Sequence, residues 1–532
     1  MILVSRAIEF EVFYYNYHKT QIETMKKWFR RMTLGMLILL LTGCAGNNLE
    51  EMIPSDATGV VSFDVPEILK QAGLLDDDRI VLPQSLQQVI DDNDTSPLCI
   101  LLNELPQMGI DTDNKAYVFF TVKTFGKVFL AMLDDPDKAR KTLEMRVGGD
   151  FEKVEGLDCM YVKDNLYVID GKVLLIGTVN KAMDAARAAR AAKGILSKTA
   201  TSIIDNKDVK TVLHDDAAIN AWMLGKGLKS ILGKSEVYRE LSQKMPLIEI
   251  FTESDIDAVV CNVELDDKRV EMATRILAAE NSEYAQLLNS TLGSPSEDVL
   301  KAIPNSMDYI FTMSVKGENF VKLKQIQQLL GMFGKLPYIG RIDLAKILST
   351  VDGPFTIGLA RDPHLEGEWN MVIATRSTDS EGVVTQISNF ANAMGQAPEM
   401  YEGEYIYQYD NKMIRIGVID GILYLKMLDY EQTEGYAYEM KPVREFFNTA
   451  LMGIFAQTRN DSINGYFEFG LEDIFNGKGH FYTNEPKANA SLELLRSLCT
   501  IKAGDAFGNE DEDENDFSSF VSGAIDKLQP ME

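Results

Sequence analysis

Val168-Ile169-Asp170-Gly171 and Val418-Ile419-Asp420-Gly421 are the same four residues, placed 250 positions apart. In each copy, runs of alternating apolar residues flank the Asp-Gly pair. Asp-Gly between such runs predicts a tight β-hairpin, because a type I′ turn needs positive φ at both central residues. The stretch therefore predicts antiparallel strands, and its recurrence predicts that the chain contains the same unit twice.

Other pairs of similar segments lie at nearly the same separation. Two pairs are 250 or close to 250 positions apart, and two more are 244 and 243 positions apart. The pairs are 53–55 with 303–305, 60–63 with 309–312, 219–222 with 463–466, and 227–231 with 470–474. Collinear matches at a nearly constant separation indicate a duplicated domain whose loops differ in length.

These patterns predict an α+β fold of two tandem related units, each built of antiparallel β-meanders with packed helices. We expect the first unit over 53–295 and the second over 303–500, with an acidic tail over 505–532. Strands and helices mix without a regular βαβ alternation, which argues against a doubly wound sheet. Helices are expected over 136–146, 181–192, 380–394 and 440–449.

The segment from Met25 to Cys44 has the features of a secretory signal. Four basic residues precede a ten-residue apolar run, and small residues close it. A membrane-spanning helix would need about 20 apolar residues, so this run is too short. We predict a signal peptide region over 1–43 with the true start of translation at Met25, because the residues before it would make an unusually acidic leader.

Leu41-Thr42-Gly43-Cys44 resembles the lipobox of bacterial lipoproteins. The resemblance implies cleavage after Gly43, lipid on the sulfur and the freed amine of Cys44, and a lipidated tether over 44–52. Ala45 after the cysteine implies sorting to the outer membrane, while periplasmic and surface-facing orientations both stay open. The expected membrane contact is this lipid, since several acyl chains together anchor a protein firmly.

The charge balance supports that expectation. The chain carries 53 Lys and Arg against 80 Asp and Glu, a net charge of −27. Removal of residues 1–43 takes away six basic and three acidic residues and leaves −30. Such a body is a poor partner for nucleic acid and for anionic membrane surfaces, so no nucleic-acid partner is expected.

Chemical motifs are scarce. The sequence has no HExxH zinc motif and no GxSxG nucleophile elbow, and its histidines stand far apart. We therefore expect no metal site, no cofactor and no enzymatic activity. Besides Cys44, the chain has four cysteines without a CxxC spacing, which leaves three disulfide pairings and buried free thiols all open: Cys99, Cys159, Cys261 and Cys499.

Two weaker candidates concern glycans. Tyr405, Tyr407 and Tyr409 alternate, so they project from one face of a strand, where they could stack on sugar rings or pack half-buried across strands. Ser462, in Asp461-Ser462-Ile463, resembles the short O-glycosylation acceptor of Bacteroidota proteins.

The lipobox, the early Ile53-Pro54-Ser55-Asp56-Ala57 turn, the repeated unit and its hairpins together resemble a family of Bacteroidota cell-envelope lipoproteins that carry a domain of unknown function. The leading hypothesis is a lipid-anchored, non-catalytic protein with a binding or structural role, whose partner is an envelope protein, a glycan or a lipid. A carrier that holds apolar ligands or lipids in a sheet-enclosed cavity is the alternative. An envelope hydrolase with a close carboxylate pair is the third hypothesis.

Overall fold

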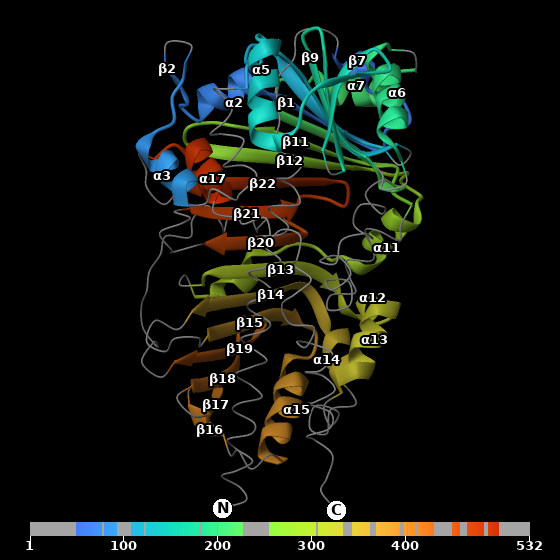
Figure 1. Cartoon of the computed structure of the whole chain (residues 1–532). Helices are drawn as coiled ribbons and strands as arrows, with labels where there is room; N and C mark the ends of the chain where they lie inside the picture. The colour runs from blue at the N-terminus through green and yellow to red at the C-terminus, as the bar shows by residue number, and fades with distance from the viewer. Residues whose placement is uncertain are drawn as a thin grey trace, which may run out of the picture.

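The structure of the protein is a computed structural model that describes most of the chain after Asn48. The described residues are 49–76, 79–92, 108–121, 124–162, 164–179, 183–198, 201–226, 255–304, 307–333, 343–361, 369–393, 398–401, 403–409, 412–429, 450–457, 465–483 and 488–499. They form an α+β structure dominated by one 20-stranded antiparallel sheet (Figure 1). The predicted α+β class and the antiparallel meanders are confirmed.

The first half of the sheet contains ten strands. Across the sheet they follow the order β6-β7-β8-β9-β5-β4-β1-β10-β11-β12. Their bounds are β1 Gly59–Asp64, β4 Lys115–Phe120, β5 Phe125–Met132, β6 Glu152–Val154, β7 Leu157–Val162, β8 Asn165–Asp170, β9 Val173–Val179, β10 Ile219–Leu224, β11 Ala258–Glu264 and β12 Arg269–Leu277.

The second half contains ten more, in the order β16-β17-β18-β19-β15-β14-β13-β20-β21-β22. Their bounds are β13 Tyr309–Lys316, β14 Val351–Arg361, β15 Trp369–Ser377, β16 Glu399–Tyr401, β17 Glu404–Tyr409, β18 Lys412–Ile419, β19 Ile422–Asp429, β20 Met452–Gln457, β21 Gly465–Leu471 and β22 Asn476–Thr483. The two orders correspond position by position, from β6 with β16 to β12 with β22.

The last strands of the two halves join them. β12 pairs with β22 in antiparallel register, from Arg269 opposite Tyr482 to Arg275 opposite Asn476. The sheet therefore runs without a break from β6 at one edge to β16 at the other (Figure 1). A separate two-stranded hairpin, β2 Leu75–Asp76 and β3 Arg79–Ile80, lies outside the main sheet.

Helices and short helical turns connect the strands. Their bounds are η1 Leu49–Met52, α2 Val65–Gln71, α3 Gln84–Asp92, α5 Pro136–Leu143, η2 Glu144–Gly148, α6 Ala185–Leu196, η3 Ile203–Asp205, α7 Lys207–Leu213, α11 Glu283–Thr291, η5 Glu297–Ala302, α12 Gly317–Phe320, α13 Lys324–Phe333, α14 Leu344–Ser349, α15 Ser380–Ala393 and α17 Ala490–Cys499. The helices expected at 136–146, 181–192 and 380–394 are present with shifted ends, and the one expected at 440–449 lies outside the described residues.

Aspartate caps decide where several of these helices begin. The side chain of Asp64 accepts a hydrogen bond from the Glu67 amide at the start of α2, 3.2 Å long. Asp184 does the same for α6, accepting from the Arg187 amide at 2.8 Å. Each cap satisfies an amide that would otherwise lack a partner in the first turn.

Helices cover both faces of the first half. We call one face the Tyr117 face, which also bears Val60 and Ser62, and the opposite one the Phe63 face. η1, α6 and α7 pack on the Tyr117 face in a core cluster with Val60 and Trp222. α2, α3, α5 and α17 pack on the Phe63 face.

The same two faces continue through the second half, because directly opposite residues in paired strands point to one side of the sheet. The Tyr117 face there bears Ile310 and Tyr424, which pack with η5. The Phe63 face packs against α11, α12 and α13 on the side nearer the β12–β22 pairing, which we call the seam, and against α15 further out.

The repeated tetrapeptide adopts two different hairpins. In the second copy Ile419 pairs with Ile422, so Asp420 and Gly421 form the two-residue loop with φ of 51° and 79°. This agrees with the predicted turn. In the first copy Asp170 pairs with Val173, so the loop is shifted by one residue and the prediction of an Asp-Gly loop is wrong there.

The identical residues lie on opposite faces of the sheet in the two copies, because a slip of one position moves each side chain to the other face, and their exposure differs as well. Val168 and Ile169 are 0% and 5% exposed, whereas Val418 and Ile419 are 41% and 42% exposed. The sequence match at 250 is therefore displaced by one residue in the sheet.

Another predicted match is also displaced. Trp222 lies in β10, which pairs with β1, whereas Tyr466 lies in β21, which pairs with β20 and β22. By pairing, β10 corresponds to β20 and not to β21. The match at 244 positions thus compares strands that hold different places in the sheet, while residues 227–231 of the match at 243 positions lie outside the described residues.

Candidate functional site

The described part of the chain begins five positions after Cys44, with a short segment whose apolar side chains are buried against the sheet. Leu49, the first residue of η1, and Ile53, the residue after its end, are 1% and 0% exposed and belong to the core cluster on the Tyr117 face. Burying two such side chains favours docking by about 1.5–3 kcal/mol each. The chain is therefore fixed to the sheet from Leu49, its first described residue.

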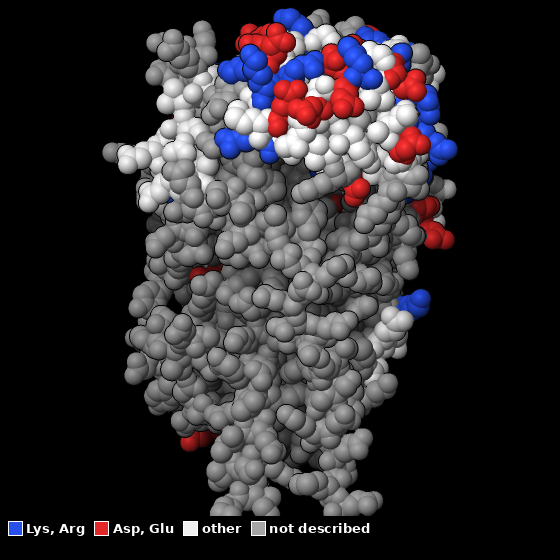
Figure 2. Space-filling view, viewed as in Figure 1, with Lys and Arg blue, Asp and Glu red and all other residues white. Residues whose placement is uncertain are grey.

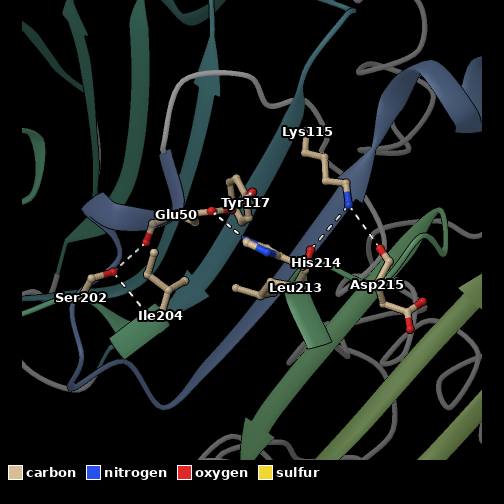
Figure 3. Close-up of polar contacts among 8 residues, drawn as sticks. All are labelled: Glu50, Lys115, Tyr117, Ser202, Ile204, Leu213, His214 and Asp215. Carbon is tan, nitrogen blue, oxygen red and sulfur yellow. Dashed lines mark hydrogen bonds and ion pairs between the residues drawn. The ribbon is translucent and has the colours of Figure 1, made fainter. Parts of the chain in front are cut away.

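Glu50 is the polar centre of this junction (Figure 3). Its Oε2 accepts a 2.8 Å hydrogen bond from the hydroxyl of Tyr117 on β4, and its Oε1 lies 2.9 Å from His214 Nε2. The backbone carbonyl of Glu50 accepts a 3.0 Å hydrogen bond from the Ser202 hydroxyl. Three distant parts of the chain thus meet at one residue of η1.

His214 is held in place by the end of α7. It is the C-cap residue, and its backbone amide donates to the carbonyl oxygens of Lys210 and Val212. Lys115 Nζ lies 3.5 Å from the carbonyl oxygen of Leu213 and 3.3 Å from that of Asp215, on either side of the histidine (Figure 3). Lys115 thus contacts the backbone on both sides of His214, whose imidazole lies against Glu50.

A second set of bonds continues the junction along the chain. Lys198 Nζ lies 2.6 Å from Glu51 Oε2. The amide of Ile203 donates to the Ile53 carbonyl at 2.9 Å, and the amide of Ser55 donates to the Thr201 carbonyl at 2.8 Å. We call residues 49–55 with their partners in 198–214, Lys115 and Tyr117 the N-terminal clasp.

The chemistry of the clasp favours a structural role. Burial, followed by the charge of Glu50, raises the pKa of Tyr117 well above its usual range, so its hydroxyl stays protonated and acts as a donor. Tyr117 is only 1% exposed, which leaves no room for a substrate at that hydroxyl. No local spacing pattern could have revealed the cluster, because its members are 67 and 164 positions from Glu50.

A second histidine–carboxylate pair lies at the seam between the halves. His480 on β22 stands opposite Glu468 on β21 and opposite Glu271 on β12. Its Nδ1 is 2.8 Å from Glu468 Oε1, and Glu468 is 2% exposed, with Oε2 lacking a hydrogen-bond partner among the described residues. Next to this row, the rings of Tyr466 and Tyr482 stack with centroids 4.8 Å apart.

The tyrosines predicted as a glycan-binding face lie on β17, and the half-buried packing that was the alternative is what the structure shows at Tyr407. Tyr407 is 5% exposed and packs against Val383 and Val384 of α15, with Tyr405 at the edge of the same cluster. A helix covers this face, so a sugar ring cannot stack on Tyr407. The side chain of Tyr409 lies outside the described residues.

Several predicted site residues lie outside the described residues. They are the lipidation residue Cys44, the lipobox residues Leu41, Thr42 and Gly43, and the glycosylation acceptor Ser462. Cys159 and Cys261 are free thiols, so none of the three complete disulfide pairings is present. The side chains of Cys99 and Cys499 are not among those described.

Metal clusters and membrane-spanning helices are both missing from the part of the chain that the structure describes. That part holds no group of three or more His, Cys, Asp or Glu side chains arranged to bind a metal ion. Its helices include none with the length and apolar character needed to cross a bilayer.

No protein-family model and no curated protein matches the chain. Two solved structures of TP0453 are similar to part of it. Crystal form III gives a TM-score of 0.29 at 10% identity and covers 46% of this chain and 86% of that one. Crystal form I gives 0.27 at 9% identity, with 46% and 85% covered. At these scores the likeness assigns neither a family nor a function to the chain.

Proposed function

We propose that the protein is a non-catalytic cell-envelope protein, anchored in the outer membrane by lipid on Cys44, with a binding or structural role. The N-terminal clasp is the observation that carries the proposal. A lipid anchor transmits position to a protein only if the residues after it are fixed to the folded body. The clasp fixes them from Leu49 onward by burial, by hydrogen bonds, by the ion pair of Glu51 with Lys198 and by the contact of Glu50 with His214.

The length of the tether makes the consequence quantitative. Five residue steps separate Cys44 from Leu49. An extended chain spans at most about 3.6 Å per residue, so η1 would lie within roughly 18 Å of the lipidated sulfur. The first half of the sheet is then the part nearest the membrane.

Surface charge supports attachment through lipid. Figure 2 shows basic side chains interspersed with acidic ones over the described surface of the first half, around α5 and α6. Such a mixture gives an anionic bilayer little net attraction. The acyl chains would therefore supply the membrane affinity.

We also infer that the two halves arose by tandem duplication. The support is the shared pairing order of their ten strands, together with the Ile-Pro segments that precede β1 and β13. A duplicated unit whose last strands pair with each other doubles the sheet and, among the described strands, leaves only β6 and β16 as its edges.

Replacement of Cys44 tests the anchor. In the host bacterium, Cys44→Ala should abolish acyl labelling and move the protein from the membrane fraction to the soluble fraction or leave it as an unprocessed precursor. Cys261→Ala, which removes a thiol on β11, is the matched control and should leave acylation and fractionation unchanged. Membrane attachment that survives Cys44→Ala without acyl label would overturn the proposal.

A further inference from the structure

Two positive side chains stand directly opposite each other near the far edge of the sheet. Arg415 on β18 is paired with Lys426 on β19, and both lie on the Tyr117 face beside Tyr424. Like charges placed opposite on neighbouring strands are destabilising, so this arrangement needs a counter-charge.

Glu404 on β17 supplies part of it. Its Oε2 lies 3.5 Å from Arg415 Nη1, while its Oε1 accepts a hydrogen bond from the hydroxyl of Tyr424. One carboxylate thus serves both the guanidinium and a buried phenol. Gly417 makes this possible, because any side chain there would collide with the Tyr424 hydroxyl.

Lys426 has no such partner among the described residues. Its ammonium lies over the ring of Tyr424, 4.6 Å from the centroid, and it forms neither an ion pair nor a hydrogen bond with any described residue. Burial lowers the pKa of Lys426; the charge of Arg415 lowers it further, while Glu404 opposes the change. Two cations and one carboxylate leave one positive charge uncompensated within this half-buried described cluster.

We propose that Arg415 and Lys426 form a binding site for the phosphate or carboxylate group of a small anionic ligand. A guanidinium offers paired donors to a planar or tetrahedral oxyanion, and an adjacent ammonium adds a point charge. Arg415 is 32% exposed in its side chain, so the site can be reached from solvent. The site gives the proposed binding role a ligand class and rests on that role.

The surroundings bear on the source of the anion. Tyr401, opposite Glu404 on β16, is 62% exposed, and Ile419, four residues beyond Arg415 on the same face, is 42% exposed. Exposed apolar side chains beside a charged site suit an amphiphile, whose charged head would contact the cations and whose apolar tail would contact these side chains. A free anion would bind the same two cations without contacting these apolar side chains.

Calorimetric titration tests the site on the chain from Ala45 to Glu532, which contains every described residue and lacks the lipid. Phosphate, acetate and octanoate are titrated at constant ionic strength, with octanoate kept below micelle formation. Lys426→Met keeps an apolar stem over the Tyr424 ring and should weaken anion binding about tenfold or more. Arg415→Gln is the second variant and should do the same.

Lys478→Met is the matched control, since Lys478 is an exposed lysine on the same face whose partner is Glu472. It should bind anions like the parent chain. Tighter binding of octanoate than acetate assigns the site to an amphiphile, and equal binding assigns it to a free anion. Absence of binding by all three anions, or equal binding by the Lys426→Met variant and the parent with unchanged circular dichroism, overturns the proposal. Neither outcome depends on lipidation of Cys44, so the anchor is tested separately.

Discussion

Tyr117 donates a 2.8 Å hydrogen bond to Glu50 Oε2, and this contact ties the first described turn of the chain to a central strand of the sheet. Tyr407, in the second half, is buried to a similar degree, but its hydroxyl has no hydrogen-bond partner among the described residues. The two tyrosines thus offer one buried hydroxyl with a hydrogen-bond partner and one without a partner among the described residues.

Tyrosine to phenylalanine changes at these positions should have opposite effects. Tyr117→Phe removes the donor to Glu50 and should lower the free energy of unfolding by about 1–2 kcal/mol. Tyr407→Phe removes an unsatisfied polar group and should leave the free energy unchanged or raise it by about 1 kcal/mol. Urea denaturation followed by circular dichroism measures both, and a larger loss for Tyr407→Phe would contradict the assignment.

The two histidine–carboxylate pairs should also differ. His480→Ala leaves Glu468, which is 2% exposed, without its partner and should cost about 3–5 kcal/mol of unfolding free energy. His214 is 47% exposed in its side chain, so His214→Ala should cost about 1 kcal/mol or less. Equal losses in the two variants, measured by the same denaturation experiment, would show that burial of Glu468 does not set the energy of its pair.

The strands and several helices were predictable from sequence because their signals are local. Period-two runs, Asp-Gly turns and aspartate caps act within about ten residues. The seam between β12 and β22 was not predictable in this way, since it pairs Arg269 with Tyr482 across the length of the second half. Strand periodicity also does not say which face is covered. For this reason the sequence leaves Tyr407 a candidate for sugar stacking, although α15 packs over it.

The shifted hairpins show a related limit. Identical residues at 168–171 and 418–421 form loops that differ by one position. The register of each hairpin follows the pairing of its own flanking strands, with Asp170 opposite Val173 in the first and Ile419 opposite Ile422 in the second. The N-terminal clasp and the Arg415–Lys426 site are likewise contacts between separate strands or helices, and no short motif encodes them.

The buried thiol of Cys159 should be unreactive in the native protein. Burial raises the pKa of Cys159 to about 11, so at pH 8 only about one thiol in a thousand is ionised. Alkylation with peptide mapping should show slow labelling of Cys159 in buffer and rapid labelling in urea. Because the folded pKa lies above the unfolded value, this group stabilises the fold fully below about pH 9 and less as the pH rises toward 11. Rapid native labelling at pH 8 would contradict the burial.

Gly417 provides the sharpest test of packing at the Glu404 and Tyr424 contact. A Cβ at position 417 would lie 2.5 Å from the Tyr424 hydroxyl oxygen and 2.8 Å from its Cζ, and Tyr424 is 1% exposed and cannot move aside. Gly417→Ala should therefore cost about 1–3 kcal/mol of unfolding free energy through overpacking. Gly126→Ala on β5 is the matched control, since no described atom lies within 4 Å of the place its methyl group would take and its φ is not positive. That control should stay within about 0.5 kcal/mol of the parent or gain stability, because alanine restricts the unfolded chain. If both alanines were tolerated equally, Tyr424 would have to be free to leave Glu404, and the excess positive charge at Arg415 and Lys426 would no longer be fixed by this geometry.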